Sequence, residues 1–152
     1  MKKIISMLFV FTMLSMVFVA CDDEKDPPVS SKTQKLESLY QEPTDTHFTF
    51  DIDLDRDSSS IYFYNVVFSI GEVDSPPLNI RIDAPVTVDK TGKVFTYAGT
   101  DIIPFLLRGN TPVPAPSFLV TNLTCIVDTN VKSYSMSFDC HGGHYDKSGQ
   151  LK

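Results

Sequence analysis

The segment Cys140-His141-Gly142-Gly143-His144 places one thiol and two imidazoles close together, and these side chains bind zinc or copper ions. Its spacing matches no closed structural zinc site, and no fourth ligand lies nearby in the sequence. The only other histidine is His47, which only folding can bring close. We therefore interpret the segment as chain that follows the last strand, and we expect no metal and no cofactor.

A second candidate for ion binding is a run of alternating aspartates: Asp51, Asp53, Asp55 and Asp57. A calcium loop that began here would need glycine at its sixth position and an acid at its twelfth. This chain has Arg56 and Tyr62 at those positions. The intervening Ile52 and Leu54 fit the period of a strand, so the aspartates are expected to form a solvated strand face.

Catalytic motifs are missing from the sequence. Serines are plentiful, but no Gly-x-Ser-x-Gly motif marks a nucleophile, and no glycine-rich loop is suited to phosphate. The carboxylate pair of a glycosidase is available by residue type, yet a small domain with a filled core leaves little room for a deep cleft. We expect no catalytic residues and no enzyme activity, with a hydrolase the least favoured class.

Aromatic residues gather in two short segments and suggest either ligand stacking or ordinary core packing: Tyr62, Phe63, Tyr64, Phe95 and Tyr97. Such rings can stack on sugars or line a cavity. They are also favoured strand residues, which makes the core the simpler interpretation. The tyrosine hydroxyls need partners or water, so the three tyrosines are expected to be the more exposed members.

The first 20 residues have the layout of a secretory signal. Lys2 and Lys3 give a cationic start, and residues 4–19 carry no charge. This apolar stretch of 16 residues is short for a membrane-spanning helix, which needs roughly 20. Small residues then lead to Cys21, and a cysteine at such a junction points to lipid attachment. An ordinary cleaved signal followed by a free cysteine is the alternative.

The junction Phe18-Val19-Ala20-Cys21 with the acidic run Asp22-Asp23-Glu24 resembles the signal of Bacteroidota lipoproteins. Phe18 stands where leucine is usual. The resemblance implies that residues 1–20 are removed and that Cys21 carries the lipid. It also implies an outer-membrane lipoprotein displayed at the cell surface. At least two acyl chains are needed, because a single chain anchors a protein only marginally.

Charge and length narrow the function further. Removal of the signal leaves 132 of the 152 residues, one domain's length, with 11 basic and 19 acidic residues and a net charge of −8. Nucleic acid is excluded as a partner, since binding it requires lysine and arginine to neutralise phosphates. The same balance argues against a basic membrane-binding face. We expect the membrane to be contacted through the lipid anchor alone.

The pattern along the chain predicts a polar tether over residues 21–44, a β domain over 45–142 and a polar tail over 143–152. Strands are expected where apolar residues alternate or cluster: residues 47–55, 61–70, 78–82, 86–88, 94–98 and 102–107. A tight turn is expected over residues 89–93, and the proline-rich residues 111–116 are expected to form an extended connection.

A terminal hairpin is expected from residues 118–127 and 133–140, turning near Thr129 and Asn130. This register sets Cys125 opposite Tyr134 and Cys140 opposite Leu119. The inward side chains are then Leu123, Cys125, Tyr134, Met136, Phe138 and Cys140. The two cysteines would lie roughly 20 Å apart along the strands, and a disulfide needs Cα atoms within about 7 Å, so we expect two buried thiols.

Seven or eight short strands predict an all-β fold, either a single antiparallel β-sandwich or a lipocalin-like β-barrel. The stretch from the 89–93 turn through residues 120–125 to Cys140 resembles the calycin-like domains of Bacteroidota lipoproteins. We expect a non-enzymatic binding or accessory module for a glycan, a peptide or a small apolar ligand. The alternatives are a calycin-like small-ligand carrier and a pilus-type structural protein.

Overall fold

The computed structural model describes residues 32–152, which form one compact unit of antiparallel strands. Six strands form the first sheet, in the order β1 (Thr33–Glu37), β2 (His47–Asp53), β3 (Ser59–Val66), β6 (Leu78–Ala84), β9 (Phe105–Arg108) and β10 (Thr111–Pro114). Five form the second, in the order β13 (Gly143–Gln150), β12 (Ser133–Cys140), β11 (Val120–Asp128), β8 (Val94–Gly99) and β7 (Val86–Val88). A small ribbon pairs β4 (Ser69–Ile70) with β5 (Val73–Asp74), and Pro116–Phe118 make a 3-10 turn.

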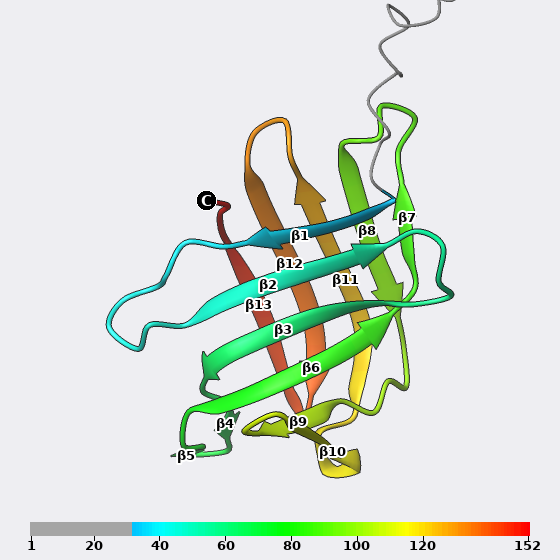
Figure 1. Cartoon of the computed structure of the whole chain (residues 1–152). Helices are drawn as coiled ribbons and strands as arrows, with labels where there is room; N and C mark the ends of the chain where they lie inside the picture. The colour runs from blue at the N-terminus through cyan, green and yellow to red at the C-terminus, as the bar shows by residue number, and fades with distance from the viewer. Residues whose placement is uncertain (1–31) are drawn as a thin grey trace, which may run out of the picture. The chain divides into compact units, whose positions relative to one another are not determined.

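The two large sheets pack face to face, and the strands of one cross those of the other at a steep angle (Figure 1). This confirms the predicted all-β antiparallel fold. Of the two architectures left open, the protein is the sandwich, because its strands form two separate sheets and no single sheet closes on itself. Within residues 32–152 no helix has the length and apolar character needed to cross a bilayer.

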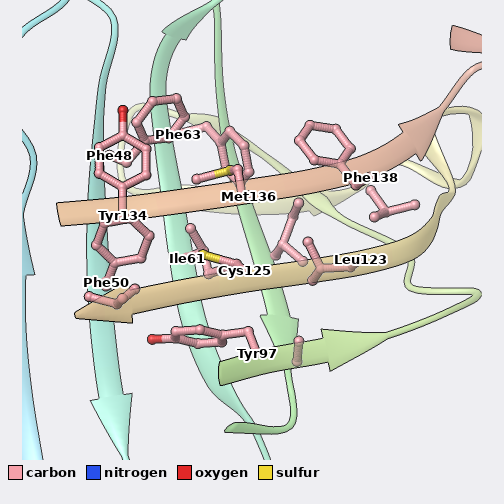
Figure 2. Packing of buried hydrophobic residues seen from close by; sticks show 14 of the residues in the cluster. Phe48, Phe50, Ile61, Phe63, Tyr97, Leu123, Cys125, Tyr134, Met136 and Phe138 are labelled. Atoms are coloured by element: carbon pink, nitrogen blue, oxygen red, sulfur yellow. The ribbon is translucent and has the colours of Figure 1, made fainter. Parts of the chain in front are cut away.

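The core lies between the sheets and is rich in aromatic rings (Figure 2). Tyr134 of β12 packs between Phe48 and Phe50 of β2, with ring centroids 5.4 Å from each. Phe63 of β3 meets Phe138 of β12 edge to face at 5.7 Å. Because each strand turns alternate side chains inward, both sheets bury one face and expose the other.

Both ends of the predicted domain are corrected by the structure. The tether was expected to continue to residue 44, but β1 runs over Thr33–Glu37 and packs Leu36 against the core. Residues 143–152 are no tail, because Gly143–Gln150 form β13 and Leu151 is only 7% exposed. The inward positions of β13 include Gly143 and Gly149, so its apolar alternation is too weak to show in the sequence. Cys21 and residues 1–20 lie outside the described residues.

The terminal hairpin forms with a register two residues from the predicted one. Cys125 pairs with Met136, because residues 129–132 make a four-residue turn. The Asp128 carboxylate accepts the Asn130 N–H at 2.8 Å and holds this turn. A shift of two keeps every side chain on its face, so the six predicted inward residues are indeed buried. A bulge near Asn122 sets Val120, and not Leu119, opposite Cys140. Cys125 and Cys140 are free, buried thiols.

Of three further predictions, one is confirmed and two are corrected. The turn over residues 89–93 is present, with Asp89 accepting the main-chain N–H groups of Lys93 and Val94 at 3.0 Å. The strand expected over residues 61–70 ends earlier, because β3 covers Ser59–Val66. The proline-rich segment is not a bare connection, since Thr111–Pro114 form the edge strand β10.

Candidate functional site

The outer face of the six-stranded sheet carries a straight row of functional side chains. The strand registers set Thr49 opposite Tyr62, Tyr62 opposite Arg81, and Arg81 opposite Phe105. Residues directly opposite in an antiparallel pair share a face and lie close together. Strands β2, β3, β6 and β9 lie side by side in this order (Figure 1). The four side chains therefore form one continuous line across the sheet.

Aromatic rings extend this line towards the sheet edge. The rings of Tyr62 and Tyr64 are nearly parallel, with centroids 6.3 Å apart. Tyr64 stacks on His47 at 4.6 Å, and His47 meets the Tyr40 ring at 4.3 Å. Tyr40 is 53% exposed, and the Lys152 ammonium lies 4.7 Å from the centre of its ring. We refer to Tyr40, His47, Tyr64, Tyr62 and Phe105 as the aromatic row.

Arg81 connects Tyr62 with the far end of the aromatic row. Its guanidinium carbon lies 4.4 Å from the centre of the Phe105 ring, a cation–π contact. One terminal nitrogen, Nη2, bonds the Asp83 carboxylate at 3.1 Å, while the buried Nε has no partner within the described residues.

Hydrogen-bonding groups flank the rings. Ser60 donates to the Asp83 carboxylate at 2.7 Å, and Lys152 pairs with Glu37 at 2.8 Å. Partial burial raises the pKa of Tyr64, so its phenol stays protonated and can donate. The face therefore combines aromatic rings, stacked on one another, with donors and acceptors beside them, the chemistry that recognises a ligand with both apolar and hydroxylated faces.

The alternating aspartates lie at the end of this same face and do not converge on one point. Asp53 pairs with Arg56 at 3.0 Å, and Asp55 pairs with Lys32 at 2.9 Å. Asp51 is exposed on the rim of a polar hollow of about 200 Å³. Within residues 32–152, no three histidine, cysteine or acidic side chains are grouped as a metal site.

The Cys140–His144 segment is also dispersed by the fold. The Cys140 thiol points inward and donates to the Phe118 carbonyl at 3.3 Å, and burial raises its pKa to about 11. His141 lies in the turn, where its Nδ1 is 2.8 Å from the Ser117 carbonyl. His144 lies on the outer face of β13. A β-strand sends neighbouring side chains to opposite faces, so the Cys140 thiol and the two imidazoles do not meet at one point.

Sequence reasoning missed one hydrogen-bonded relay, formed by Ser137, His144 and Asp139. Ser137 Oγ lies 3.3 Å from His144 Nε2, and His144 Nδ1 lies 2.6 Å from an Asp139 oxygen. The Asn122 amide donates to the other Asp139 oxygen at 2.7 Å. The signal for this relay was the two-residue turn His141-Gly142, both with positive φ, because such a turn sets Asp139 opposite His144.

The relay connects serine, histidine and aspartate in the same order as in a serine hydrolase. Its surroundings, however, differ from those in such an enzyme. Ser137 lies in the middle strand of three, paired with Thr124 on one side and Asp146 on the other. Its main-chain N–H is therefore used within the sheet and cannot stabilise an oxyanion. The His144 Nε2 also lies 3.4 Å from the Asp146 carboxylate. The relay is best explained as cross-strand pairing on a solvated sheet.

Comparison with protein-family models, with curated proteins and with solved structures finds no match for this chain. The structural class of the chain is therefore assigned from its own fold. It is a two-sheet antiparallel β-sandwich with an aromatic row on its six-stranded sheet and a hydrogen-bonded relay on its five-stranded sheet.

Proposed function

We propose that the chain is a non-enzymatic, surface-displayed outer-membrane lipoprotein, anchored through Cys21, that binds glycans on its aromatic row. The observation that carries the proposal is the side-by-side stacking of His47, Tyr64 and Tyr62. Aromatic rings present flat apolar surface with a polar tip, which suits the C–H faces and hydroxyls of sugars.

A glycan explains the polar groups beside the rings better than an apolar ligand does. Covering Asp83, Arg81 and Glu37 with a purely apolar molecule would remove them from water without new hydrogen bonds, which is costly. Sugar hydroxyls would supply those bonds, including one to the unpartnered Arg81 Nε after a small side-chain movement. The net charge of −8 that remains after removal of residues 1–20 favours a neutral glycan over a polyanion.

The alternatives, which are a small-ligand carrier, a peptide-binding module and a pilus-type structural protein, have less support than a glycan-binding module. The space between the sheets is filled with side chains (Figure 2), so the interior offers nothing in favour of a calycin-like carrier. A peptide ligand is the nearest alternative for the aromatic row, and competition between peptide and glycan would separate the two. A pilus-type structural protein is the alternative class, and growth of chain-to-chain polymers would reveal it.

Glycan binding is tested by affinity electrophoresis of the full chain in detergent through gels that contain defined neutral polysaccharides. A retarded wild type is expected. Tyr62→Ala and Tyr64→Ala should each bind about fivefold more weakly, because each loses a ring contact of about 1 kcal/mol. Ser135→Ala, on the opposite sheet, should migrate as the wild type. Absence of retardation by every polysaccharide, or equal retardation of all variants, would overturn the proposal.

The lipid anchor is tested by growing cells with a fatty-acid probe. The wild type and Cys125→Ser should take up the label, and Cys21→Ser should not. Surface display is then tested by adding protease to intact cells, which should degrade the labelled protein. Labelling of Cys21→Ser, or an unlabelled wild type, would contradict the lipid anchor and would leave the proposed glycan binding unaffected.

A further inference from the structure

The strand β13 leaves part of its main chain unpaired at the edge of the five-stranded sheet. It pairs with β12 over its whole length without a shift. The Gln150 carbonyl accepts the Leu39 N–H, and the Ser148 carbonyl accepts the Gln41 amide, so even-numbered residues turn their main-chain groups to the free edge. By the same alternation, the N–H and C=O groups of His144 and Asp146 also face that edge.

The edge of β13 lacks the protection that the edge strands β10 and β7 have. β10 carries Pro112 and Pro114, which cannot donate, and β7 is only three residues long and follows Pro85. β13 has eight residues, no proline and no bulge. Segments near Leu39 and Gln41 cover only its last residues, and exposed regular edges of this kind readily pair with another strand.

A groove of about 370 Å³ runs beside this open part of the strand. Its lining includes five consecutive strand residues, from Gly143 to Lys147, together with Val67 and Ser69. Tyr145 lies at the centre of the five, and its hydroxyl donates to the Ser69 carbonyl at 3.1 Å. The groove therefore lies along the strand over residues 143–147, and Tyr145 is the middle residue of this run.

We propose that β13 pairs antiparallel with β13 of a second copy of this chain, about a two-fold axis at Tyr145, so that the two five-stranded sheets become continuous. A two-fold axis perpendicular to the sheet places the outer faces of both copies on the same side. Because side chains alternate along a strand, this requires the axis to pass between two copies of the same residue. Centring on Asp146 or Lys147 would set two like charges opposite each other. Centring on Tyr145 sets His144 of each copy opposite Asp146 of the other.

This register provides hydrogen-bond partners for the edge-facing main chain and also places oppositely charged side chains together. His144 and Asp146 both point their N–H and C=O groups to the edge, so each of the two cross-copy pairs exchanges two main-chain hydrogen bonds. Each His144 would then lie between Asp139 of its own copy, 2.6 Å away, and Asp146 of the other. The contact is a narrow strip, which places the pairing among weak, concentration-dependent associations.

The pairing is tested by sedimentation equilibrium of the full chain in density-matched detergent, from micromolar to millimolar protein. The wild type should show a monomer–dimer equilibrium. Asp146→Pro removes an edge-facing N–H without breaking the β12 ladder, so this variant should stay folded by circular dichroism and remain monomeric. Asp146→Lys, which sets a cation opposite His144, should weaken the dimer at least tenfold.

Ser135→Lys adds charge to the same outer face on the middle strand and should dimerise as the wild type. A wild type that stays monomeric throughout, or an Asp146→Pro dimer of wild-type strength, would overturn the proposal. Assemblies that grow beyond a dimer would overturn it too, because a two-fold contact closes on itself.

Discussion

His144 Nδ1 lies 2.6 Å from an oxygen of Asp139, directly across the β12–β13 ladder. The Asp139 hydrogen bond raises the pKa of His144, and the Asn122 and His144 hydrogen bonds lower the pKa of Asp139. His144 is 58% exposed, so solvent weakens the pair. The pair nonetheless ties the last strand to its neighbour and makes the fold sensitive to pH.

The contribution of this pair to the stability of the domain is expected to be highest in mildly acidic solution. A raised histidine pKa stabilises the fold fully below about pH 6.5, and this contribution is lost as the pH rises through the folded value. The lowered Asp139 pKa stabilises the fold above about pH 3.9, and its contribution is lost as the pH falls. Thermal melts should therefore show a small fall in Tm between pH 5 and pH 8. His144→Gln should lose that fall, and His141→Gln should keep it.

Met136→Asp should strongly destabilise the domain, whereas Ser135→Asp should cost little. Met136 is 3% exposed and faces Cys125 between the sheets, so a carboxylate there is buried without a partner. The expected loss is about 3 kcal/mol of the free energy of unfolding. Ser135 is exposed on the other face of the same strand. Chemical denaturation measures both, and a larger loss from Ser135→Asp would contradict the register.

Tyr97→Phe and Tyr134→Phe should have opposite consequences. The Tyr97 hydroxyl is buried and has no partner in the described part of the chain, so its removal should leave stability unchanged or raise it by about 1 kcal/mol. The Tyr134 hydroxyl accepts the Gln41 amide at 2.8 Å, and its removal should cost about 1 kcal/mol. Urea denaturation compares them. Equal losses would mean that Tyr97 has a hydrogen-bond partner in solution, such as a buried water.

The relay of Ser137, His144 and Asp139 is expected to be chemically inert. The main-chain N–H of Ser137 is used within the sheet and cannot stabilise an oxyanion, and the His144 side chain is 58% exposed. A fluorophosphonate probe should leave the wild type unlabelled, and Ser137→Ala should match it in ester hydrolysis. Labelling that disappears in Ser137→Ala would show instead that the relay activates a serine.

Local periodicity determined much of the fold from the sequence alone. The alternation of Tyr134, Met136 and Phe138 with serines identified both the strand and its buried face. The two-residue error in register left these faces unchanged, because side chains repeat every two residues along a strand. The all-β class, the 89–93 turn and the thiols' burial follow from the same short-range information.

Pairing between strands far apart in sequence was decided only by the tertiary structure. The aromatic row exists because β3 lies between β2 and β6, and β9 lies beside β6, which local pattern does not encode. β13 was predicted to be a tail, since its inward positions include two glycines and it is stabilised by the ladder to β12. Long-range packing and strand pairing together bring Tyr62 to Arg81 and Asp139 to His144, whereas sequence periodicity describes one strand at a time.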